Sequence, residues 1–362
     1  MESNITGSDT FLWSDVDWKA LRTLRERFLQ FDPREAKPTE DPENGDSNDE
    51  SAVTETKVAE PNRSDYWSSI NDLKSYDFTF GERIGWKWDT VIAELQTRGW
   101  TPPAGTVLDW GCGTGIAGRR VVGAWPDVAH KLLPWDRSGR ARDFAVARAR
   151  AAFPGLDVRA AAGPETAPDL LVVSHVINEL PEEQLERLLV TAGQAQAVLW
   201  VEPGTSDASR KLIAVRERLL GRFRVVAPCT HALACPMLAA GNERHWCHHF
   251  AKIPGHVHID SGWGRFSQTM KIDLATLPFS FLVLDRRPAA VNTQPEESRM
   301  IGRARYYKGY AKLLSCQGEG LLELTLAKRA APELLKAMKK DPGSLYRWDR
   351  DGGNILGGEQ VF

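Results

Sequence analysis

The chain has 362 residues, of which 42% are hydrophobic and 26% charged, and its formal net charge is −2. This length fits one large domain or two modest ones, because single hydrophobic cores stop growing at roughly 250–300 residues. No apolar run approaches the roughly 20 residues needed to span a bilayer, so we expect no membrane partner. The first residues lack the character of a targeting peptide, so we expect a cytoplasmic protein, where clustered cysteines favour metal binding or catalysis over disulfides.

The charge is unevenly distributed along the chain. Residues 32–60 carry a local charge of −7, whereas residues 61–362 carry +6. Because residues 32–64 contain almost no large apolar side chains, we predict that they form an acidic, flexible linker. The mildly basic body is compatible with an anionic partner, although a charge of +6 is too small to establish one.

The N-terminal segment 1–31 is predicted to contain one amphipathic helix, at about residues 15–31. Ser14 and Asp17 resemble a capping box, and apolar residues then recur at helical spacing: Val16, Ala20, Leu24 and Phe28. A partner-binding arm is one interpretation of this stripe. We favour packing against the body, because a helical apolar stripe is first of all a core face.

An alternation of strand-like and helical segments follows. Helices are predicted from Tyr66 to about Leu95, and the strand-like runs after them are 106–110, 131–135, 157–161, 169–174 and 197–202. Such alternation indicates βαβ units and a parallel sheet, so residues 65–221 are predicted to form the core. We further predict a Cys-rich insertion at 222–278 and strands within 279–330 that complete the sheet as a hairpin with a long basic loop. Residues 331–362 would then be a C-terminal tail.

A glycine-rich turn lies between the first predicted strand and the helix after it. It contains Asp109, Gly111, Gly113 and Gly115, and Asp136 lies twenty-one positions beyond Gly115, where an acidic residue would hold a ribose hydroxyl. The spacing Gly-x-Gly-x-Gly after an Asp is closer to the S-adenosylmethionine signature than to the dinucleotide one. We therefore predict a cofactor site; a tight turn without a ligand is the alternative, and Cys112 is interpreted as a small loop residue.

The segment Ser174-His-Val-Ile-Asn-Glu-Leu-Pro181 follows the fourth predicted strand. It falls at the carboxyl edge of the sheet, where open α/β folds bind ligands. Asn178 and Glu179 are candidates to orient a substrate amine or contact the cofactor, and capping of the next helix is an equally good explanation for both residues. We interpret His175 as structural.

Four of the five cysteines form a second candidate site: Cys229, Cys235, Cys247 and Cys316. Their spacing differs from that of zinc fingers, whose Cys pairs lie two to four residues apart. Four thiolates, one of them in a Cys-Pro pair, suit a [4Fe–4S] cluster. Nearby histidines keep a Cys/His zinc site open as an alternative, namely His231, His245, His248 and His249.

Cations and aromatic residues are mixed between residues 286 and 312. They include Arg303, Arg305, Tyr307, Lys308 and Tyr310. This mixture suits phosphate contacts combined with base stacking, and a solvated hairpin face is the alternative.

Several segments together resemble one known family. They are Gly85-Trp-Lys-Trp, Leu108-Asp-Trp-Gly-Cys-Gly-Thr-Gly, Asn178-Glu-Leu-Pro, Val201-Glu-Pro-Gly-Thr, Pro228-Cys, Cys235-Pro, Trp246-Cys-His, Phe279-Ser-Phe and Lys312-Leu-Leu-Ser-Cys316. These segments resemble the Rsm-twenty-two family, methyltransferase-like proteins that act in assembly of the small ribosomal subunit. The resemblance runs from about Tyr66 to Lys328, and its most specific part is the cysteine block.

The resemblance implies an α/β, seven-stranded S-adenosylmethionine-dependent methyltransferase (Rossmann-like) fold with a Cys-rich metal-binding insertion. It assigns Cys229, Cys235, Cys247 and Cys316 to an iron–sulfur cluster, and Asp109, Gly111, Gly113, Gly115 and Asp136 to the cofactor. The expected partner is the small ribosomal subunit and its rRNA, with no DNA. An rRNA methyltransferase, with Asn178 and Glu179 at the methyl side, is the leading hypothesis. A non-catalytic rRNA-binding assembly factor and a zinc-stapled small-molecule methyltransferase are the alternatives.

Overall fold

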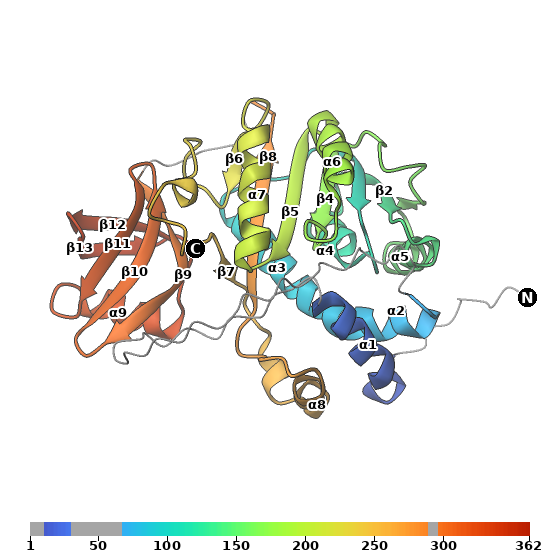
Figure 1. Cartoon of the computed structure of the whole chain (residues 1–362), viewed down its shortest axis with the longest axis horizontal. Coiled ribbons are helices and arrows are strands. Elements are labelled where there is room, and N and C mark those ends of the chain that lie inside the picture. Colours follow the sequence, from blue (N-terminus) through green and yellow to red (C-terminus); the bar gives the residue numbers. More distant parts are fainter. Residues whose placement is uncertain (1–10, 30–66, 289–295) are drawn as a thin grey trace, which may run out of the picture.

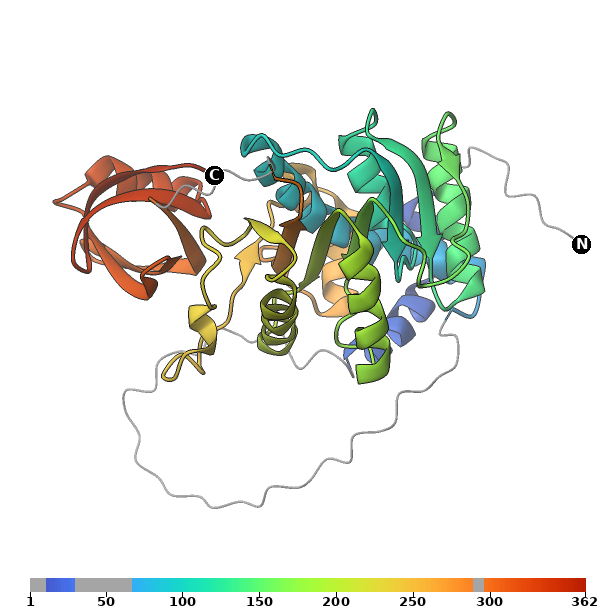
Figure 2. The same cartoon turned by 90° about the horizontal axis from the view of Figure 1, so that it is seen from above.

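The structure, a computed structural model, describes residues 11–29, 67–288 and 296–362. The predicted linker at 32–64 lies outside the described residues. An α/β unit forms one part of the molecule, and a small β-barrel lies at one end of it in both views (Figure 1, Figure 2).

The N-terminal helix packs against the body. A short 3-10 turn, η1 (Trp13–Asp15), precedes helix α1 (Trp18–Leu29). Asp17 Oδ1 accepts the N–H groups of Lys19 and Ala20, so Asp17 caps the helix and the predicted cap at Ser14 is wrong. Val16, Leu21 and Leu24 are buried in the main core, which confirms the packing interpretation of the stripe.

A continuous helical stretch runs from residue 70 to residue 97. It consists of α2 (Ile70–Tyr76), a π-helical turn labelled η2 (Asp77–Gly81) and α3 (Glu82–Thr97). The Asp77 carboxylate accepts hydrogen bonds from Arg119 (2.6 Å) and Arg148 (3.1 Å). These ion pairs hold the π-helical turn beside the helices that follow β1 (Gly105–Trp110) and β2 (Ala129–Trp135). Such turns are frequent at functional sites.

The central sheet has seven main strands in the order β3-β2-β1-β4-β5-β8-β6. The strands are β1 (Gly105–Trp110), β2 (Ala129–Trp135), β3 (Asp157–Val158), β4 (Leu170–Ser174), β5 (Ala197–Pro203), β6 (Arg224–Ala227) and β8 (Pro278–Asp285). The pairs among β1 to β5 are parallel, and β8 runs antiparallel between β5 and β6. The predicted parallel βαβ core is confirmed.

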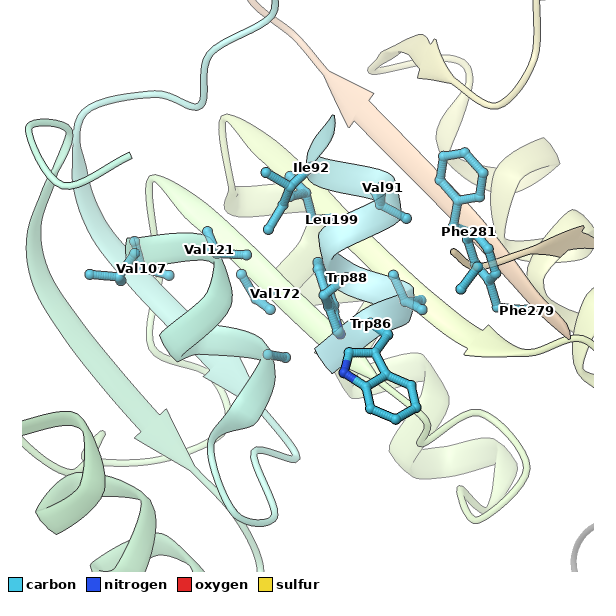
Figure 3. Close-up of a cluster of buried hydrophobic side chains, with 14 of the residues drawn as sticks. Trp86, Trp88, Val91, Ile92, Val107, Val121, Val172, Leu199, Phe279 and Phe281 are labelled. Atoms are coloured by element: carbon cyan, nitrogen blue, oxygen red, sulfur yellow. The ribbon is translucent and has the colours of Figure 1, made fainter. Parts of the chain in front are cut away.

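Helices cover both faces of this sheet. Helices α3, α4 (Ile116–Ala124) and α5 (Gly139–Ala152) lie on one face, and α6 (Glu182–Gln194) and α7 (Ser206–Leu219) lie on the other. Successive strand residues alternate between the two cores, as the period of a strand requires: Val107 packs on one side and Leu108 on the other. Figure 3 shows Trp88 and Val91 of α3 packed with Val172 and Leu199 of the sheet.

The segment between β6 and β8 contains three of the four clustered cysteines. It also contains the short elements η3 (Pro236–Leu238), β7 (His249–Phe250) and η4 (Gly255–His258), and then helix α8 (Ser261–Met270). Strand β7 pairs with the start of β8. Trp263 and Phe266 of α8 join the main core, so this end of the segment packs on the α/β unit.

The C-terminal strands form a closed barrel of their own. Its elements are β9 (Glu297–Tyr307), β10 (Tyr310–Gln317), β11 (Gly320–Ala327), α9 (Pro332–Lys340), β12 (Leu345–Asp351) and β13 (Asn354–Gln360). Alternate apolar residues of the strands, such as Leu313 and Leu324, face a separate core with Tyr346. The prediction that residues 321–327 complete the sheet, with a long basic loop before them, is therefore wrong. Residues 331–362 form a helix and two strands, not a tail.

A buried ion pair joins the barrel to the α/β unit. Arg299 of β9 pairs with Glu94 of α3, and both side chains are at most 3% exposed. Arg299 also donates to the carbonyl oxygen of Pro228 (2.8 Å) and to Ser344 Oγ (2.8 Å). These bonds satisfy the guanidinium and fix the barrel beside the start of the Cys-rich segment. None of the described helices is long and apolar enough to cross a membrane.

Candidate functional site

A cleft opens at the carboxyl edge of the parallel strands, where open α/β sheets bind ligands. The glycine-rich turn after β1 forms one wall, with Gly111 (φ +68°) and Gly113 (φ +51°) in the left-handed region. A Cβ atom built on Gly113 would meet no other atom within 4 Å, so the turn leaves open space there. The predicted ligand-facing role suits Gly111 and Gly113, both of which line the cleft.

Two other residues of the motif lie behind the turn. Asp109 is 1% exposed, and its Oδ2 accepts the Gly118 N–H (3.0 Å) at the start of α4. Its Oδ1 has no hydrogen-bond partner among the described residues and remains available as an acceptor. A Cβ on Gly115 would come within 2.8 Å of Ala145 of α5, so this glycine permits close helix packing. Gly118, where a Cβ would meet Asp109 at 2.7 Å, is a requirement that the motif alone did not reveal.

Asp136 directly follows β2 and lines the cleft beside the turn. Its Oδ2 accepts the Gly113 N–H (2.9 Å), and its Oδ1 accepts the Ser138 N–H (2.8 Å). The carboxylate therefore bridges the glycine-rich turn and the start of α5. The structure brings Asp136 and Gly113 together, as expected for a shared cofactor site.

A buried carboxylate supports the loop after β4. Glu202 of β5 is fully buried, and its Oε1 accepts the N–H groups of Val176 (3.2 Å) and Ile177 (3.1 Å) and the indole N–H of Trp200. Burial raises the pKa of Glu202 to about 7, against the lowering effect of these hydrogen bonds. Glu202 thus fixes the backbone of the loop after β4 at Val176 and Ile177.

Glu179 and Asn178, the two residues predicted at the methyl side, point to different surroundings. Glu179 lines the cleft, whereas Asn178 Oδ1 accepts a hydrogen bond from Lys211 of α7 (3.2 Å) and is not among the cleft-lining residues. Burial raises the pKa of Glu179 to about 7; Arg137 lowers it and Asp136 raises it. A carboxyl group with this pKa can exchange a proton near neutral pH, as a general base must.

His175 lies between the loop and helix α3. Its backbone has φ +56°, which is rare for a residue with a side chain and is often found at functional sites. Its Nε2 lies 3.0 Å from Lys87 Nζ, and its Nδ1 lies 3.1 Å from Ser174 Oγ. Burial, and then Lys87, hold the pKa of His175 well below its ordinary value, so the ring is neutral.

Aromatic residues complete the cleft, and the sequence analysis did not assign them to it. They are Trp67, Tyr76, Trp110 and Trp135, and Trp110 and Trp135 pack with ring centroids 4.6 Å apart. Trp110 and Trp135 are the last residues of β1 and β2, so their position next to the motif was a usable signal. Trp67 and Tyr76 come from the segment before the sheet, whose contact with the cleft depends on the tertiary fold.

Three of the four cysteines predicted as metal ligands pack together from separate segments. Cys235, Cys247 and Cys316 pack in one cluster with Met237, Ile213 and Ile301. Burial, followed by the charges of Cys229, Cys316 and Cys235, raises the pKa of Cys247 well above its ordinary value. Cys229 packs instead against the core that contains Leu212 and Leu219 of α7. Cys112, in contrast, lies in the cleft.

Polar groups surround the cysteine cluster. Arg216 of α7 donates to the carbonyl oxygens of His231 (3.1 Å) and Leu233 (2.9 Å) and also interacts with Cys229. Ser209 and Ser280 both donate to the carbonyl oxygen of Cys247 (2.8 and 2.7 Å). In residues 11–29, 67–288 and 296–362, no group of three or more His, Cys, Asp or Glu side chains is arranged to hold a metal ion as it stands.

The nearby histidines fall into two groups. His249 Nε2 lies 3.6 Å from Cys247 Sγ, and His231 Nε2 lies 3.9 Å from Cys316 Sγ. His248 instead stacks on Trp246, with ring centroids 4.8 Å apart, and His245 accepts a hydrogen bond from Arg244. Of the four histidines considered as zinc ligands, His231 and His249 are therefore the two that contact the thiols.

The strand order, the antiparallel β8 and the glycine-rich turn at the carboxyl edge define an α/β methyltransferase-like protein. Within that class, the chain belongs to the family described as mitochondrial small ribosomal subunit Rsm22, whose model matches residues 91–352. No curated protein sequence matches the chain significantly.

Solved methyltransferase structures are distantly similar. Magnesium protoporphyrin IX methyltransferase from Synechocystis PCC 6803, with bound SAM, is 13% identical; the match covers 61% of this chain and 86% of that one, with a TM-score of 0.36. A precorrin-6y C5,15-methyltransferase from Geobacter metallireducens GS-15 is 10% identical over 55% and 86%, with a TM-score of 0.33. A SAM dependent methyltransferase from Aquifex aeolicus is 15% identical over 43% and 89%, with a TM-score of 0.32. Because these scores are low, the fold class rests on the strand order itself.

Proposed function

We propose that this protein is an S-adenosylmethionine-dependent methyltransferase that acts on small-subunit rRNA during ribosome assembly and holds a [4Fe–4S] cluster. The observation that carries the proposal is the family match over residues 91–352, together with a cleft at the glycine-rich turn. The small ribosomal subunit is the proposed partner because the family is described by it. Cytoplasmic residence stays a prediction.

The cleft residues fit S-adenosylmethionine. The open space at Gly113 permits close approach of a ligand to the backbone, and Asp136 is close to that space. The unpartnered Asp109 Oδ1 offers a further buried acceptor. Bound there, the cofactor would supply an electrophilic methyl group for in-line transfer. Methyl transfer needs mainly proximity and orientation, which the aromatic walls and the loop fixed by Glu202 provide.

Glu179 is the side chain best placed to assist the transfer. It lines the cleft, and its pKa of about 7 suits removal of a proton from an incoming nucleophile. The neutral His175 beside Lys87 is proposed to shape the cleft instead of moving protons. Asn178, which bonds Lys211, is proposed to act through the loop, as a positioning residue.

The cysteine cluster fits an iron–sulfur cofactor by its donor set. Three of the thiols pack in one cluster, the charge of Cys229 contributes to the raised pKa of Cys247, and Arg216 supplies positive charge beside Cys229. Cys229, Cys235, Cys247 and Cys316 are the proposed ligands. A zinc ion held by thiols with His231 or His249 is the alternative, favoured by the two short sulfur–nitrogen distances.

Two measurements test the proposal. Anaerobically purified protein should contain about four irons per chain, whereas stoichiometric zinc without iron would contradict the cluster assignment. Purified small-subunit rRNA should accept labelled methyl groups from S-adenosylmethionine in the presence of the protein. If the protein binds both cofactor and subunit but transfers no methyl group, it is a non-catalytic assembly factor.

A further inference from the structure

The five strands of the C-terminal barrel have a recognisable connectivity. We number these strands one to five in chain order, from β9 to β13. Around the barrel, the order is one, two, three, five, four, and strand four pairs back with strand one. The third and fifth strands, β11 and β13, pair in parallel, and α9 connects the third strand to the fourth. This is the connectivity of the OB-fold, whose members bind oligonucleotides or oligosaccharides on strands two and three and on the flanking loops.

In this barrel an open groove lies over the corresponding elements. The groove is formed by the turn between strands one and two, the start of strand two and the end of strand three. The connection from strand three to the helix and the start of strand five complete it. Its lining residues are Lys308, Gly309, Tyr310, Thr325, Ala327, Lys328, Arg329, Pro332 and Asn354.

The charges of the groove favour a polyanion over a neutral sugar. Lys308, Lys328 and Arg329 are exposed cations, and none of the lining residues is a carboxylate. On the adjacent surface, Arg305 (3.0 Å) and Lys312 (2.9 Å) share the single carboxylate of Glu323. Phosphate contacts by such side chains provide most of the affinity of proteins for nucleic acids.

Aromatic side chains stand beside these cations. Lys308 and Gly309 (φ +94°) form a two-residue turn that places Tyr307 opposite Tyr310, and their rings stack at 4.8 Å with an interplanar angle of 12°. Tyr307 is 40% exposed. Exposed rings next to a basic groove are the means by which OB-folds stack unpaired bases.

The other half of the same barrel face is already covered. Leu314 and Leu321 pack with Cys316, Cys235 and Met237 of the cysteine cluster. The open half is therefore the polar, aromatic end of the face.

We propose that this groove binds a single-stranded segment of RNA, with phosphates on Lys308, Lys328 and Arg329 and a base on the Tyr307–Tyr310 pair. The choice of RNA rests on the proposed function, in which rRNA is the partner. The geometry assigns the barrel a binding task distinct from that of the cofactor cleft.

The test measures binding of the full chain to fluorescently labelled oligouridylate of about 12 nucleotides, a length within the range of OB-fold sites. Anisotropy titrations over a series of salt concentrations should show that Lys308→Ala/Lys328→Ala lowers the slope of log Kd against log salt by about 1.4, because each lost phosphate contact on a single strand removes about 0.7. Tyr310→Ala should weaken binding about 5- to 150-fold, the range for loss of one stacked base. Tyr310→Phe should retain most of the affinity, since the aromatic ring remains.

The matched control is Lys336→Ala/Lys340→Ala, which removes the same charge from exposed positions of α9 on the same barrel. It should leave the slope nearly unchanged, and a thermal melt of each variant checks folding. Equal effects of the two double variants, or equal affinity for duplex RNA of the same length, would overturn the proposal. Cofactor binding and methyl transfer are measured separately, so failure of the proposed function leaves this result interpretable.

Discussion

Two carboxyl groups at the cleft, Asp109 and Glu202, are buried, and a third, Glu179, is half-buried. Burial raises the pKa of each of the three to about 7. Their surroundings separate their tasks. Asp109 accepts a backbone N–H of α4 and Glu202 accepts one of the loop after β4, whereas Glu179 lines the cleft itself. Burial of an ionisable group that serves the site costs stability at neutral pH, which can be measured.

Glu202 provides one such measurement. Its pKa is about 7 in the folded protein and 4.5 when unperturbed, so the folded state holds the proton more strongly. Stability from this group is therefore fully present below about pH 4.5 and is lost as pH rises towards 7. Glu202→Gln keeps the oxygen acceptor and removes the titration. Between about pH 5 and pH 8, the variant should gain about 2.5 kcal/mol in unfolding free energy relative to the unmodified protein.

The comparison uses urea unfolding at the two pH values, with Glu183→Gln as a control, because the Glu183 side chain is 79% exposed. The test compares the stability difference between variant and unmodified protein at one pH with the same difference at the other pH. A constant effect of the new amide cancels in this comparison. A difference that does not change with pH would show that Glu202 ionises normally.

Gly113 provides a test of the cofactor cleft. Gly113→Arg should abolish binding of S-adenosylmethionine, because the new side chain would fill the open space beside Asp136. Isothermal titration calorimetry measures the loss. Gly155→Arg adds the same side chain at an exposed glycine outside the cleft and should bind normally. Absence of binding heat with the unmodified protein would sink the cofactor assignment.

At the scale of elements, the α/β unit was the predictable part of the fold. Its strands are short apolar runs separated by amphipathic helices, so local pattern and tertiary environment agree; β1, β4 and β5 lie within a residue or two of the predicted runs. The third predicted strand, 157–161, is regular only over Asp157 and Val158, although Arg159 and Ala161 still donate their N–H groups to carbonyl oxygens of β2.

The barrel could not be predicted in the same way. Strand β9 mixes Arg and Tyr with apolar residues because only its first half is covered, and this pattern resembles a basic loop. Of the three cations named in this stretch, Lys308 lines the groove, Arg303 lies over Phe250 and Arg305 pairs with Glu323. Closure of a barrel depends on pairing between strands far apart in sequence, which no local pattern records.

The candidate cleft was predicted in part. The glycine-rich turn and Asp136 were recognisable because the backbone conformation and the strand ends are encoded locally. Glu202 and Lys87 were not assigned, because their contacts with residues 174–177 exist only after the sheet has formed.

The cysteine segment gives a prediction at the element scale. Cys316 is the one proposed ligand that lies on the barrel, and binding of metal to such a site is coupled to folding. Cys316→Ser should lose the iron and lower the melting temperature under anaerobic conditions. Cys112→Ser, within the cofactor cleft, should keep its iron. Iron retained by Cys316→Ser would remove this residue from the ligand set.

At the scale of the whole molecule, the buried pair between Glu94 and Arg299 joins the barrel to the α/β unit. Burial alone would raise the pKa of Glu94, but Arg299 and Arg98 outweigh it and hold the pKa below its ordinary value. Glu94→Leu leaves Arg299 buried without its partner and should cost about 3–5 kcal/mol in unfolding free energy. Glu94→Leu/Arg299→Met replaces both charges and should recover much of that loss. Equal instability of the single and double variants would show that the pair itself is not the cause.

The same pair has a consequence for how a target could be chosen. The bonds of Arg299 to Glu94 of α3 and to Pro228 restrain the barrel and favour one separation between its groove and the cofactor cleft. Two sites held rigidly on one chain engage a single strand together only when the span between them matches. The span between the two sites would then set the distance between the RNA segment bound by the barrel and the nucleotide in the cleft. On the proposed function, the choice of nucleotide would depend on its distance along the RNA from the segment bound by the barrel.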